Sequence, residues 1–431
     1  MKKRLITIAV ALITGAALLF PQSPVRKLPQ ATESRIDSII RMMTLEEKLG
    51  QLNQIGGTWY DTKTERLNEE QTAMLKAGQI GSFLGITGAA ETGRIQRMVM
   101  KESRMKIPVL FGADIIHGYS TITPIPLAEA SSWNPALVER SARMAAMEGS
   151  AVGIHWTYAP MVDIARDPRW GRIAEGSGED PHLGSVMGAA RVKGFQGDDL
   201  LQFGSLLACA KHFAAYGGAE AGRDYNTVDM SERTLREVFL PPYKAAIDAG
   251  AWTLMSAFNE IGGVPASGST WLMTDLLRKE WGFTGLVVSD YTAVMELMNH
   301  RIAKDSTEAG IIGLSSGVDI DMVSRIYLRK LSDAVRTGVL SESVVDEAVR
   351  RVLRVKFVYG LFDDPYRNAK PEKEKELLLA PAHRDIARIM AQQSIVLLKN
   401  EKELLPISKS ARTIALVGPL AGNDHRRDLV G

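Results

Sequence analysis

The chain has 431 residues, which is enough for one large barrel domain and part of another. Its 45% apolar and 24% charged residues place it among ordinary globular proteins, and a net charge of +2 argues against a nucleic-acid-binding protein. The only cysteine, Cys209, excludes an intrachain disulfide and a thiolate metal cage. The seven histidines contain no H-E-x-x-H pattern, so we expect no metal site and no cofactor.

The N-terminus has the pattern of an export signal. Lys2, Lys3 and Arg4 precede an apolar run over 5–20, which Pro21 breaks. This order predicts a signal peptide over 1–23, with an uncleaved membrane anchor as the alternative. We therefore expect a periplasmic or secreted protein without membrane association once the signal is removed.

Strand-like and helix-like segments alternate after a polar linker. An amphipathic helix is predicted over 36–52, with a capping-type sequence at 44–47 inside it. Strands are predicted over 80–86, 108–114, 156–164, 206–213, 253–258, 286–289 and 319–323. Helices are predicted over 91–104, 134–152, 183–195, 231–249, 269–281 and 308–314, with two more over 327–359. Seven or eight such pairs in about 300 residues indicate a TIM-like (β/α)8 barrel, with a doubly wound open sheet as the alternative.

The domain organisation follows from these segments. The barrel is expected over 31–362 and a linker over 363–382. Residues 383–431 resemble the start of a second α/β sandwich domain, with a helix to about residue 393 and strands over 394–398 and 413–417. Fewer than 50 residues cannot bury an independent α/β core, so we expect this second domain to be truncated.

Polar residues follow the predicted strands. These residues are Asp114, Asp163, Lys211, His212, Asn259, Asp290, Asp319 and Asp321. In a barrel such positions converge on one mouth, where α/β barrels place their chemistry. Asp290, which ends the apolar run 286–288, is either a cap of the next helix or a catalytic carboxylate, and this convergence favours catalysis.

Hydrolysis of a sugar requires paired carboxyl groups and groups that bind hydroxyls. Asp114, Arg172, Lys211 and His212 are suited to holding a diol, because carboxylates accept hydrogen bonds from hydroxyls and cations donate to them. Each also has a plain structural interpretation: Asp114 as a turn cap, Arg172 paired with Glu175, and Lys211 as a solvated strand end.

Several motifs in register resemble glycoside hydrolase family 3, in the form of its bacterial periplasmic β-glucosidases. They lie at 159–164, 167–172, 178–181, 211–217, 222–225 and 288–290. The resemblance covers roughly 36–422. It implies a retaining, exo-acting β-glycosidase that acts on a small oligosaccharide or glucoside.

The resemblance also implies roles for individual residues. Asp290 is the nucleophile that forms a covalent glycosyl-enzyme. The residues that bind the non-reducing sugar are Asp114, Arg172, Lys211 and His212, with Met255 and Tyr291 lining the pocket. For Lys211 and His212 to reach one sugar, the family suggests a non-proline cis peptide between them, since neighbouring strand residues point to opposite faces.

The general acid is the main departure from the family pattern. In the β-glucosidases of the family it is a Glu of the second domain, beyond the end of this sequence. The hexosaminidase branch instead carries an Asp-Ser-His loop, which 217–225 lacks. Glu175 and Glu220 are available carboxylates, and Glu175 is expected to hold Lys211 or Arg172. The alternatives are a non-catalytic sugar-binding remnant, and β-xylosidase or exo-glucanase specificity.

Overall fold

The computed structural model describes residues 28–57, 67–418 and 421. The expected signal peptide at 1–23 lies outside these residues. The chain divides into two compact units, Met1–Ser394 and Ile395–Gly431. No helix in the described ranges has the length and apolarity needed to cross a bilayer.

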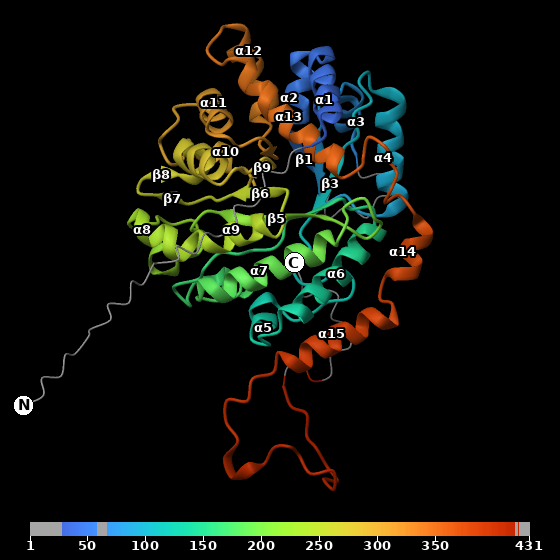
Figure 1. Cartoon of the computed structure of the whole chain (residues 1–431), viewed down its shortest axis with the longest axis vertical. Coiled ribbons are helices and arrows are strands. Elements are labelled where there is room, and N and C mark those ends of the chain that lie inside the picture. The colour runs from blue at the N-terminus through green and yellow to red at the C-terminus, as the bar shows by residue number, and fades with distance from the viewer. Residues whose placement is uncertain (1–27, 58–66, 419–420, 422–431) are drawn as a thin grey trace, which may run out of the picture. The chain divides into compact units, whose positions relative to one another are not determined.

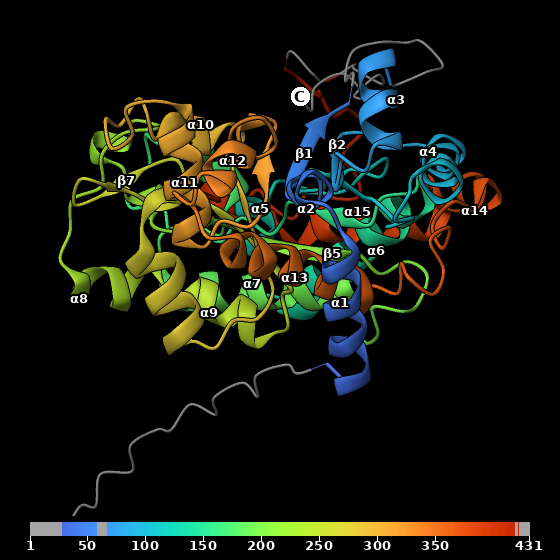
Figure 2. The ribbon, with the colours of Figure 1, turned by 90° about the horizontal axis from the view of Figure 1, so that it is seen from above.

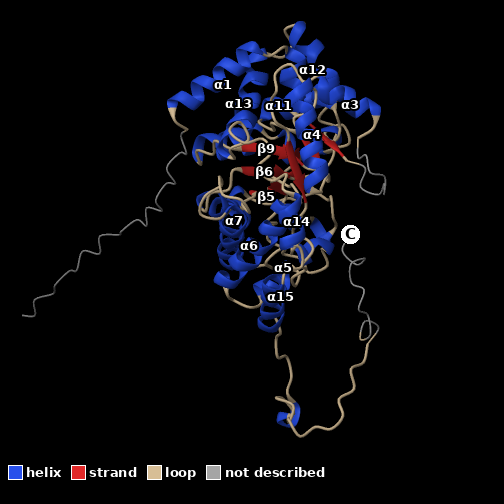
Figure 3. Ribbon diagram, turned by 90° about the vertical axis from the view of Figure 1, so that its right-hand side faces the viewer, coloured by secondary structure: helices blue, strands red, loops and turns tan. Residues whose placement is uncertain are grey.

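An eight-stranded parallel barrel forms the centre of the first unit, with helices around it (Figure 3). The strand order is β10-β1-β2-β3-β4-β5-β6-β9. The strands are β1 (Asn53–Gly56), β2 (Ser82–Leu84), β3 (Leu110–Ala113), β4 (Trp156–Thr157), β5 (Leu207–Phe213), β6 (Thr253–Ser256), β9 (Leu286–Ser289) and β10 (Asp321–Met322). This arrangement confirms the predicted barrel and excludes the open sheet.

The barrel closes at a seam between β9 and β10. One bridge pairs Val288 with Ile320, and the amide of Ser289 donates to the carbonyl of Ile320 at 2.8 Å. The Ser289 hydroxyl accepts from the amide of Met322 at 2.9 Å and so adds a side-chain bond to the short ladder. On its other edge β10 pairs with β1, which lies beside β2 (Figure 2).

The strand β1 is absent from the sequence-based prediction. Its side chains Asn53 and Gln54 are polar but fully buried. Asn53 donates to the carbonyl of Gln79 at 2.8 Å, and Gln54 donates to the hydroxyl of Tyr158 at 2.8 Å. Tertiary hydrogen bonds therefore satisfy the amide nitrogens of both side chains, whereas Oδ1 of Asn53 and Oε1 of Gln54 have no partner among the described residues. An apolar pattern does not register a strand with such side chains.

The prediction of one continuous helix over 36–52 is wrong. Two helices replace it, α1 (Gln30–Met42) and α2 (Leu45–Gln51). Thr44 caps the second, in a reciprocal capping box with Glu47. The capping sequence therefore starts a new helix here, because its side chains satisfy the free amides of a helix N-terminus.

The predicted strand over 156–164 is shorter in the structure. The β4 ladder ends at Thr157, and only an isolated bridge from Met161 to Lys211 follows. Pro160 stands between the two, and proline has no N–H to donate to a ladder.

The remaining helices cover the barrel. They are α3 (Glu69–Lys76), α4 (Ala89–Glu102), α5 (Pro126–Ala130), α6 (Pro135–Ala151), α7 (Pro181–Gln196), α8 (Glu232–Thr234), α9 (Pro241–Asp248), α10 (Ala293–Glu296), α11 (Ser306–Ser316), α12 (Ile326–Arg336) and α13 (Glu342–Val358), with π-helices η4 (Leu235–Phe239) and η6 (Trp271–Glu280). Asn134 caps α6 and Ser231 caps α8. Figure 1 shows α13 beside α1 and α2, which it contacts.

The segment after the barrel differs from the expectation. The expected linker over 363–382 contains a helix, α14 (Pro371–Leu377), and α15 (Pro381–Gln393) packs on α6 through Met390. The strands predicted over 394–398 and 413–417 are wrong, because both segments are irregular in the structure. An isolated strand has no partner for its backbone groups, and no other strand of the described residues pairs with either segment.

Candidate active site

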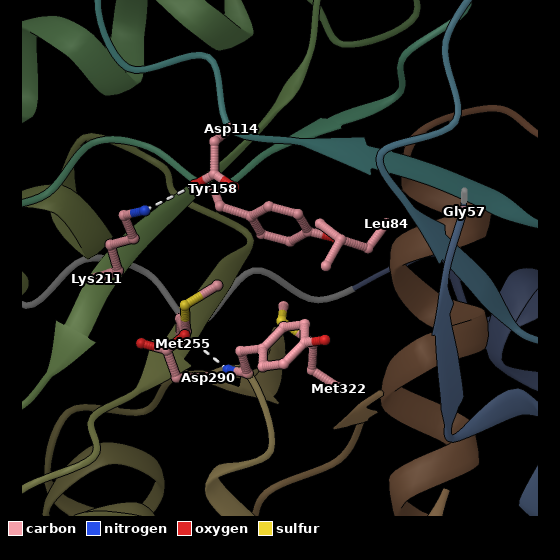
Figure 4. Close-up of a pocket in the computed structure, with 9 residues that line it drawn as sticks. Gly57, Leu84, Asp114, Tyr158, Lys211, Met255, Asp290 and Met322 are labelled. Carbon is pink, nitrogen blue, oxygen red and sulfur yellow. Dashed lines mark hydrogen bonds and ion pairs between the residues drawn. The ribbon is translucent and has the colours of Figure 1, made fainter. Parts of the chain in front are cut away.

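A cavity of about 460 Å³ lies at the carboxyl ends of the barrel strands (Figure 4). Its lining residues are Gly57, Leu84, Asp114, Tyr158, Lys211, Met255, Asp290, Tyr291 and Met322. The structure thus brings together five of the seven predicted site residues as lining: Asp114, Lys211, Met255, Asp290 and Tyr291. Of the other two, His212 lies 3.5 Å from Asp290, and Arg172 contacts His212.

Asp290 directly follows β9 and is 8% exposed. Its Oδ1 accepts from the amide of Tyr291 at 2.7 Å. Its Oδ2 has no hydrogen-bond partner among the described residues and lies 3.5 Å from Nε2 of His212. The side chain therefore presents an oxygen that the fold itself does not use.

Burial raises the pKa of Asp290 from 3.8 to about 7. The nearby cations Lys211 and Arg172 oppose this rise, since they favour the carboxylate. A buried carboxyl group with a strongly raised pKa at a barrel mouth is a marker of a functional site.

The helix that follows Asp290 is not capped by it. Thr292 occupies the N-cap position of α10, and no side chain caps that helix. Asp290 contributes only its backbone carbonyl, which accepts from the amide of Ala293 at 3.0 Å. The geometry therefore does not support the interpretation of Asp290 as a helix cap.

Lys211 and Asp114 form an ion pair in the pocket, with Nζ and Oδ1 2.8 Å apart (Figure 4). The Lys211 side chain is almost fully buried, whereas Asp114 is partly exposed at the mouth. Burial lowers the pKa of Lys211, but the charges of Asp114 and Glu175 outweigh it, so the net pKa is raised. Lys211 is therefore a buried cation rather than a solvated strand end.

His212 is held in a fixed tautomer. Its Nδ1 and its backbone amide lie 2.8 and 2.9 Å from Oδ2 of Asp163. Burial, together with Arg172 and Lys211, lowers the pKa of His212 well below its usual range. A neutral ring that donates from Nδ1 presents a lone pair at Nε2, which lies 3.0 Å from Nη2 of Arg172.

The expected cis peptide between Lys211 and His212 is present, and a second one joins Phe213 to Ala214. Both side chains reach the site: Lys211 through Asp114, and His212 through its contact with Asp290.

Arg172 is paired with Glu175, as the plain interpretation anticipates. Its Nε donates to Oε1 at 2.8 Å and its Nη2 lies 3.2 Å from Oε2. The same Nη2 also reaches His212, so the pairing orients the guanidinium towards the site. Burial raises the pKa of Glu175, but Arg172 and Lys211 outweigh it and the net pKa is lowered.

Three more residues belong to the site or support it. Sequence reasoning put Asp163 at the barrel mouth without giving it a role, and it missed Tyr243 and Tyr158. Asp163 anchors His212, the hydroxyl of Tyr243 lies 2.6 Å from Oδ1 of Asp163, and Tyr158 lines the pocket. Asp163 follows a predicted strand, which is a usable signal. Tyr243 lies 80 residues away on α9, and no spacing in the sequence links it to Asp163.

No cluster of His, Cys, Asp and Glu side chains in the described part of the chain could hold a metal ion. The chemistry available at this site comes from carboxylates, cations and one neutral imidazole.

Residues 44–355 match the glycosyl hydrolase family 3 N terminal domain. This match, together with the barrel and its polar mouth, shows that the chain belongs to this family of glycoside hydrolases.

Named relatives support the assignment. The chain is 42% identical to a periplasmic beta-glucosidase of Salmonella typhimurium, over 98% of this chain and 55% of the relative. It is 35% identical to a putative beta-xylosidase of Formosa agariphila, over 99% of this chain and 59% of the relative. Among solved structures, a mutant beta-glucosidase from Listeria innocua in complex with laminaribiose superimposes with a TM-score of 0.83 at 41% identity, covering 89% of this chain and 54% of that one. The chain thus spans little more than half the length of these proteins.

Proposed function

We propose that the protein is the barrel part of a retaining, exo-acting β-glucosidase that removes terminal non-reducing β-D-glucosyl residues. The observation that carries the proposal is Asp290, a buried carboxylate that lines a sugar-sized pocket and has one oxygen without a hydrogen-bond partner among the described residues. The similarity to beta-glucosidases supports the substrate class. The predicted signal and the similarity to a periplasmic relative support an exported protein.

The proposed reaction assigns a role to each of these side chains. Asp290 attacks the anomeric carbon, the bond to the leaving oxygen breaks, and an ester joins the glucosyl unit to Asp290. Water then hydrolyses this ester, which restores the carboxylate and gives net retention. The Asp114–Lys211 pair binds adjacent hydroxyls, because the carboxylate accepts and the ammonium donates. Arg172, as a donor, and the neutral ring of His212, as an acceptor at Nε2, complete the polar wall.

We place the general acid outside the described pocket. Asp114 and Asp290 are the carboxyl groups among the described lining residues, and Asp114 is already paired with Lys211. Glu175 is paired with Arg172, and Glu220 does not line the pocket. We therefore assign this role to a Glu of the second domain, as the family resemblance implies. General acid catalysis contributes about 10²–10⁴-fold, so the chain alone is expected to act mainly on glycosides with good leaving groups.

A covalent trapping experiment tests the proposal. The purified chain is incubated with dinitrophenyl 2-deoxy-2-fluoro-β-glucoside, whose leaving group departs without acid assistance. We expect a mass gain of one fluoroglucosyl unit on the peptide that contains Asp290, and none in the Asp290→Asn variant. No label on a folded protein would overturn the proposal and leave a sugar-binding remnant. Calorimetry with glucose would then measure binding alone.

A second specificity has a basis in the relatives. Two Formosa agariphila proteins, a putative beta-xylosidase and a beta-xylosidase, are 35% and 38% identical to this chain, and an exo-1,3/1,4-beta-glucanase superimposes with a TM-score of 0.79. Trapping with the corresponding 2-fluoroxyloside separates glucosidase from xylosidase. Faster labelling by the xyloside than by the glucoside would favour xylosidase.

A further inference from the structure

One buried carboxylate binds two segments that lie far apart in the chain. Glu148 is on α6 and is fully buried. Its Oε2 accepts hydrogen bonds from the amides of Ser120 and Thr121, each at 2.8 Å, and its Oε1 accepts from the hydroxyl of Thr121 at 2.6 Å. Oε1 also accepts from the amide of Leu379 at 3.0 Å and lies 3.0 Å from Nδ1 of His383. Glu148 therefore joins the loop after β3 to the start of α15.

The loop after β3 begins with Asp114, the pocket residue that pairs with Lys211. Residues 114–125 form neither a helix nor a continuous strand, so tertiary hydrogen bonds determine the course of this loop. An isolated bridge from Gly118 to Ile122 closes its turn, and Glu148 binds the tip of that turn. The position of Asp114 therefore depends on the groups that hold the turn.

Two buried anchors hold this loop, and they differ in what else they bind. Arg191 of α7 donates to the carbonyl of Ile116 at 3.1 Å and is paired with Glu129 of α5. This first anchor consists of residues from barrel helices. The second anchor, at Glu148, includes residues that follow the barrel, so it makes the loop sensitive to the docking of α15.

The start of α15 has a defined geometry. The helix packs on α6 (Figure 1), and Met390 contributes to their shared apolar cluster. Leu379, just before the helix, has a φ of +57°, in the left-handed region that such residues rarely adopt. Residues persist in this conformation where the surrounding structure holds them, and the bond from the Leu379 amide to Glu148 does so here.

Glu148 is a carboxylate at neutral pH. Burial raises its pKa, but hydrogen bonds from His383 and Thr121 outweigh burial, so the net pKa is lowered. A carboxylate only accepts hydrogen bonds, so Nδ1 of His383 carries the hydrogen between them. Loss of this donor leaves a buried charge with an unfilled position. The donors that remain belong in part to the turn, which must then readjust.

We propose that Glu148 is a positioning residue that makes the affinity for sugar depend on the docking of α15, because it holds the turn at 120–121, and through it Asp114, in the place set by the start of that helix. This inference rests on the proposed function, since it takes Asp114 to be a sugar ligand. The segment after the barrel is then part of the support of the sugar-binding pocket. Asp290 is not a member of this chain of contacts, so the covalent step should be unaffected.

Labelling of Asp290 by dinitrophenyl 2-deoxy-2-fluoro-β-glucoside separates positioning from general stability. Saturation kinetics give the half-saturating concentration and the maximal rate, and mass spectrometry gives the fraction of protein that can be labelled. We expect Glu148→Gln to raise the half-saturating concentration about tenfold and His383→Leu about threefold, with unchanged maximal rates. A merely structural role would lower the labelled fraction and leave the half-saturating concentration as it is.

Two matched variants control for other effects of these changes. His383→Asn keeps an N–H donor near the position of Nδ1 and should restore the wild-type value. Gln393→Ala breaks another bond of α15, which Asn134 at the start of α6 donates at 2.9 Å, without touching Glu148. This variant should leave both kinetic constants unchanged.

A double variant tests the route through Asp114. If Glu148 acts through that residue, Glu148→Gln should add little to the half-saturating concentration of Asp114→Asn, because interacting residues have non-additive effects. Full additivity of the two changes would overturn the inference.

The remaining outcomes separate this inference from the proposed function. An unchanged half-saturating concentration in Glu148→Gln and His383→Leu, or an equal rise in Gln393→Ala and His383→Leu, would overturn the inference alone. If Glu148→Gln does not fold, the two His383 variants decide. If wild-type protein is not labelled, the proposed function fails, and calorimetry with glucose decides instead: weaker binding by the variants supports the positioning role, and equal binding overturns it. If wild-type protein does not bind glucose either, both fail.

Discussion

Replacing Asp290 by Asn should stabilise the folded protein, and by an amount that grows with pH. The folded-state pKa of Asp290 is raised from 3.8 to about 7 by burial. Between these values the folded protein holds a proton that the unfolded chain has released. Stability is therefore lost as pH rises across this window. Asn remains neutral throughout, and its amide oxygen can still accept from the amide of Tyr291.

The magnitude follows from the size of the pKa shift. At 1.36 kcal/mol per pKa unit, the rise from 3.8 to about 7 corresponds to about 4 kcal/mol above pH 7. The difference in unfolding free energy between Asp290→Asn and wild type should therefore grow by up to about 4 kcal/mol from pH 4 to pH 8. A buried carboxyl group with a raised pKa is a cost to folding at neutral pH, which the substitution removes.

Urea unfolding followed by tryptophan fluorescence at pH 4.5, 6 and 8 measures this difference. Asp363→Asn, at an exposed position after α13, controls for the loss of one carboxylate from the chain. A difference between Asp290→Asn and wild type that is the same at all three pH values would refute the reasoning. A stability loss at pH 8 would refute it as well.

Three further predictions concern the site and the fold. The rate at which the dinitrophenyl reagent labels Asp290 should rise with pH through about 7, because only the carboxylate attacks; a flat profile from pH 5 to 8 would contradict this. Asp114→Asn should raise the half-saturating concentration of that reagent about 10–100-fold, since charge-assisted hydrogen bonds to sugar hydroxyls are lost and Lys211 loses its partner; an unchanged saturation curve would exclude the assigned role. Thr44→Ala should lower the unfolding free energy by about 1 kcal/mol in urea, whereas Thr44→Ser should retain the bond to the amide of Glu47; equal losses in the two variants would rule out the capping explanation.

The sequence was sufficient to predict which residues meet at the mouth of the barrel. Buried parallel strands appear as apolar runs, and the residues that follow these runs lie at the same end of the barrel. Leu286 to Val288 followed by Asp290 illustrates this rule, and β9 has the predicted bounds, Leu286–Ser289. The rule fails for β1, whose buried Asn53 and Gln54 depend on partners 26 and 104 residues away.

The residues that hold His212 in place could not be predicted from local sequence patterns. The contact between Tyr243 and Asp163 exists only after α9 has packed against the barrel. The segments over 394–398 and 413–417 show the opposite error, because β-branched and apolar residues predict strands whether or not a pairing edge is present. Strand propensity is local, whereas a strand requires a neighbour.

The closure of the barrel sets an order of events during synthesis. Asn53 of β1 pairs with Asp321 of β10, and the seam beside it joins Val288 to Ile320. One edge of β1 therefore stays unpaired until residue 321 of β10 has been made. An open parallel edge is a template for pairing with other chains, and non-local pairing is slow. A chain cut before residue 321 would keep that edge open permanently. The yield of folded protein should therefore depend on the last strand of the barrel more than its two residues suggest.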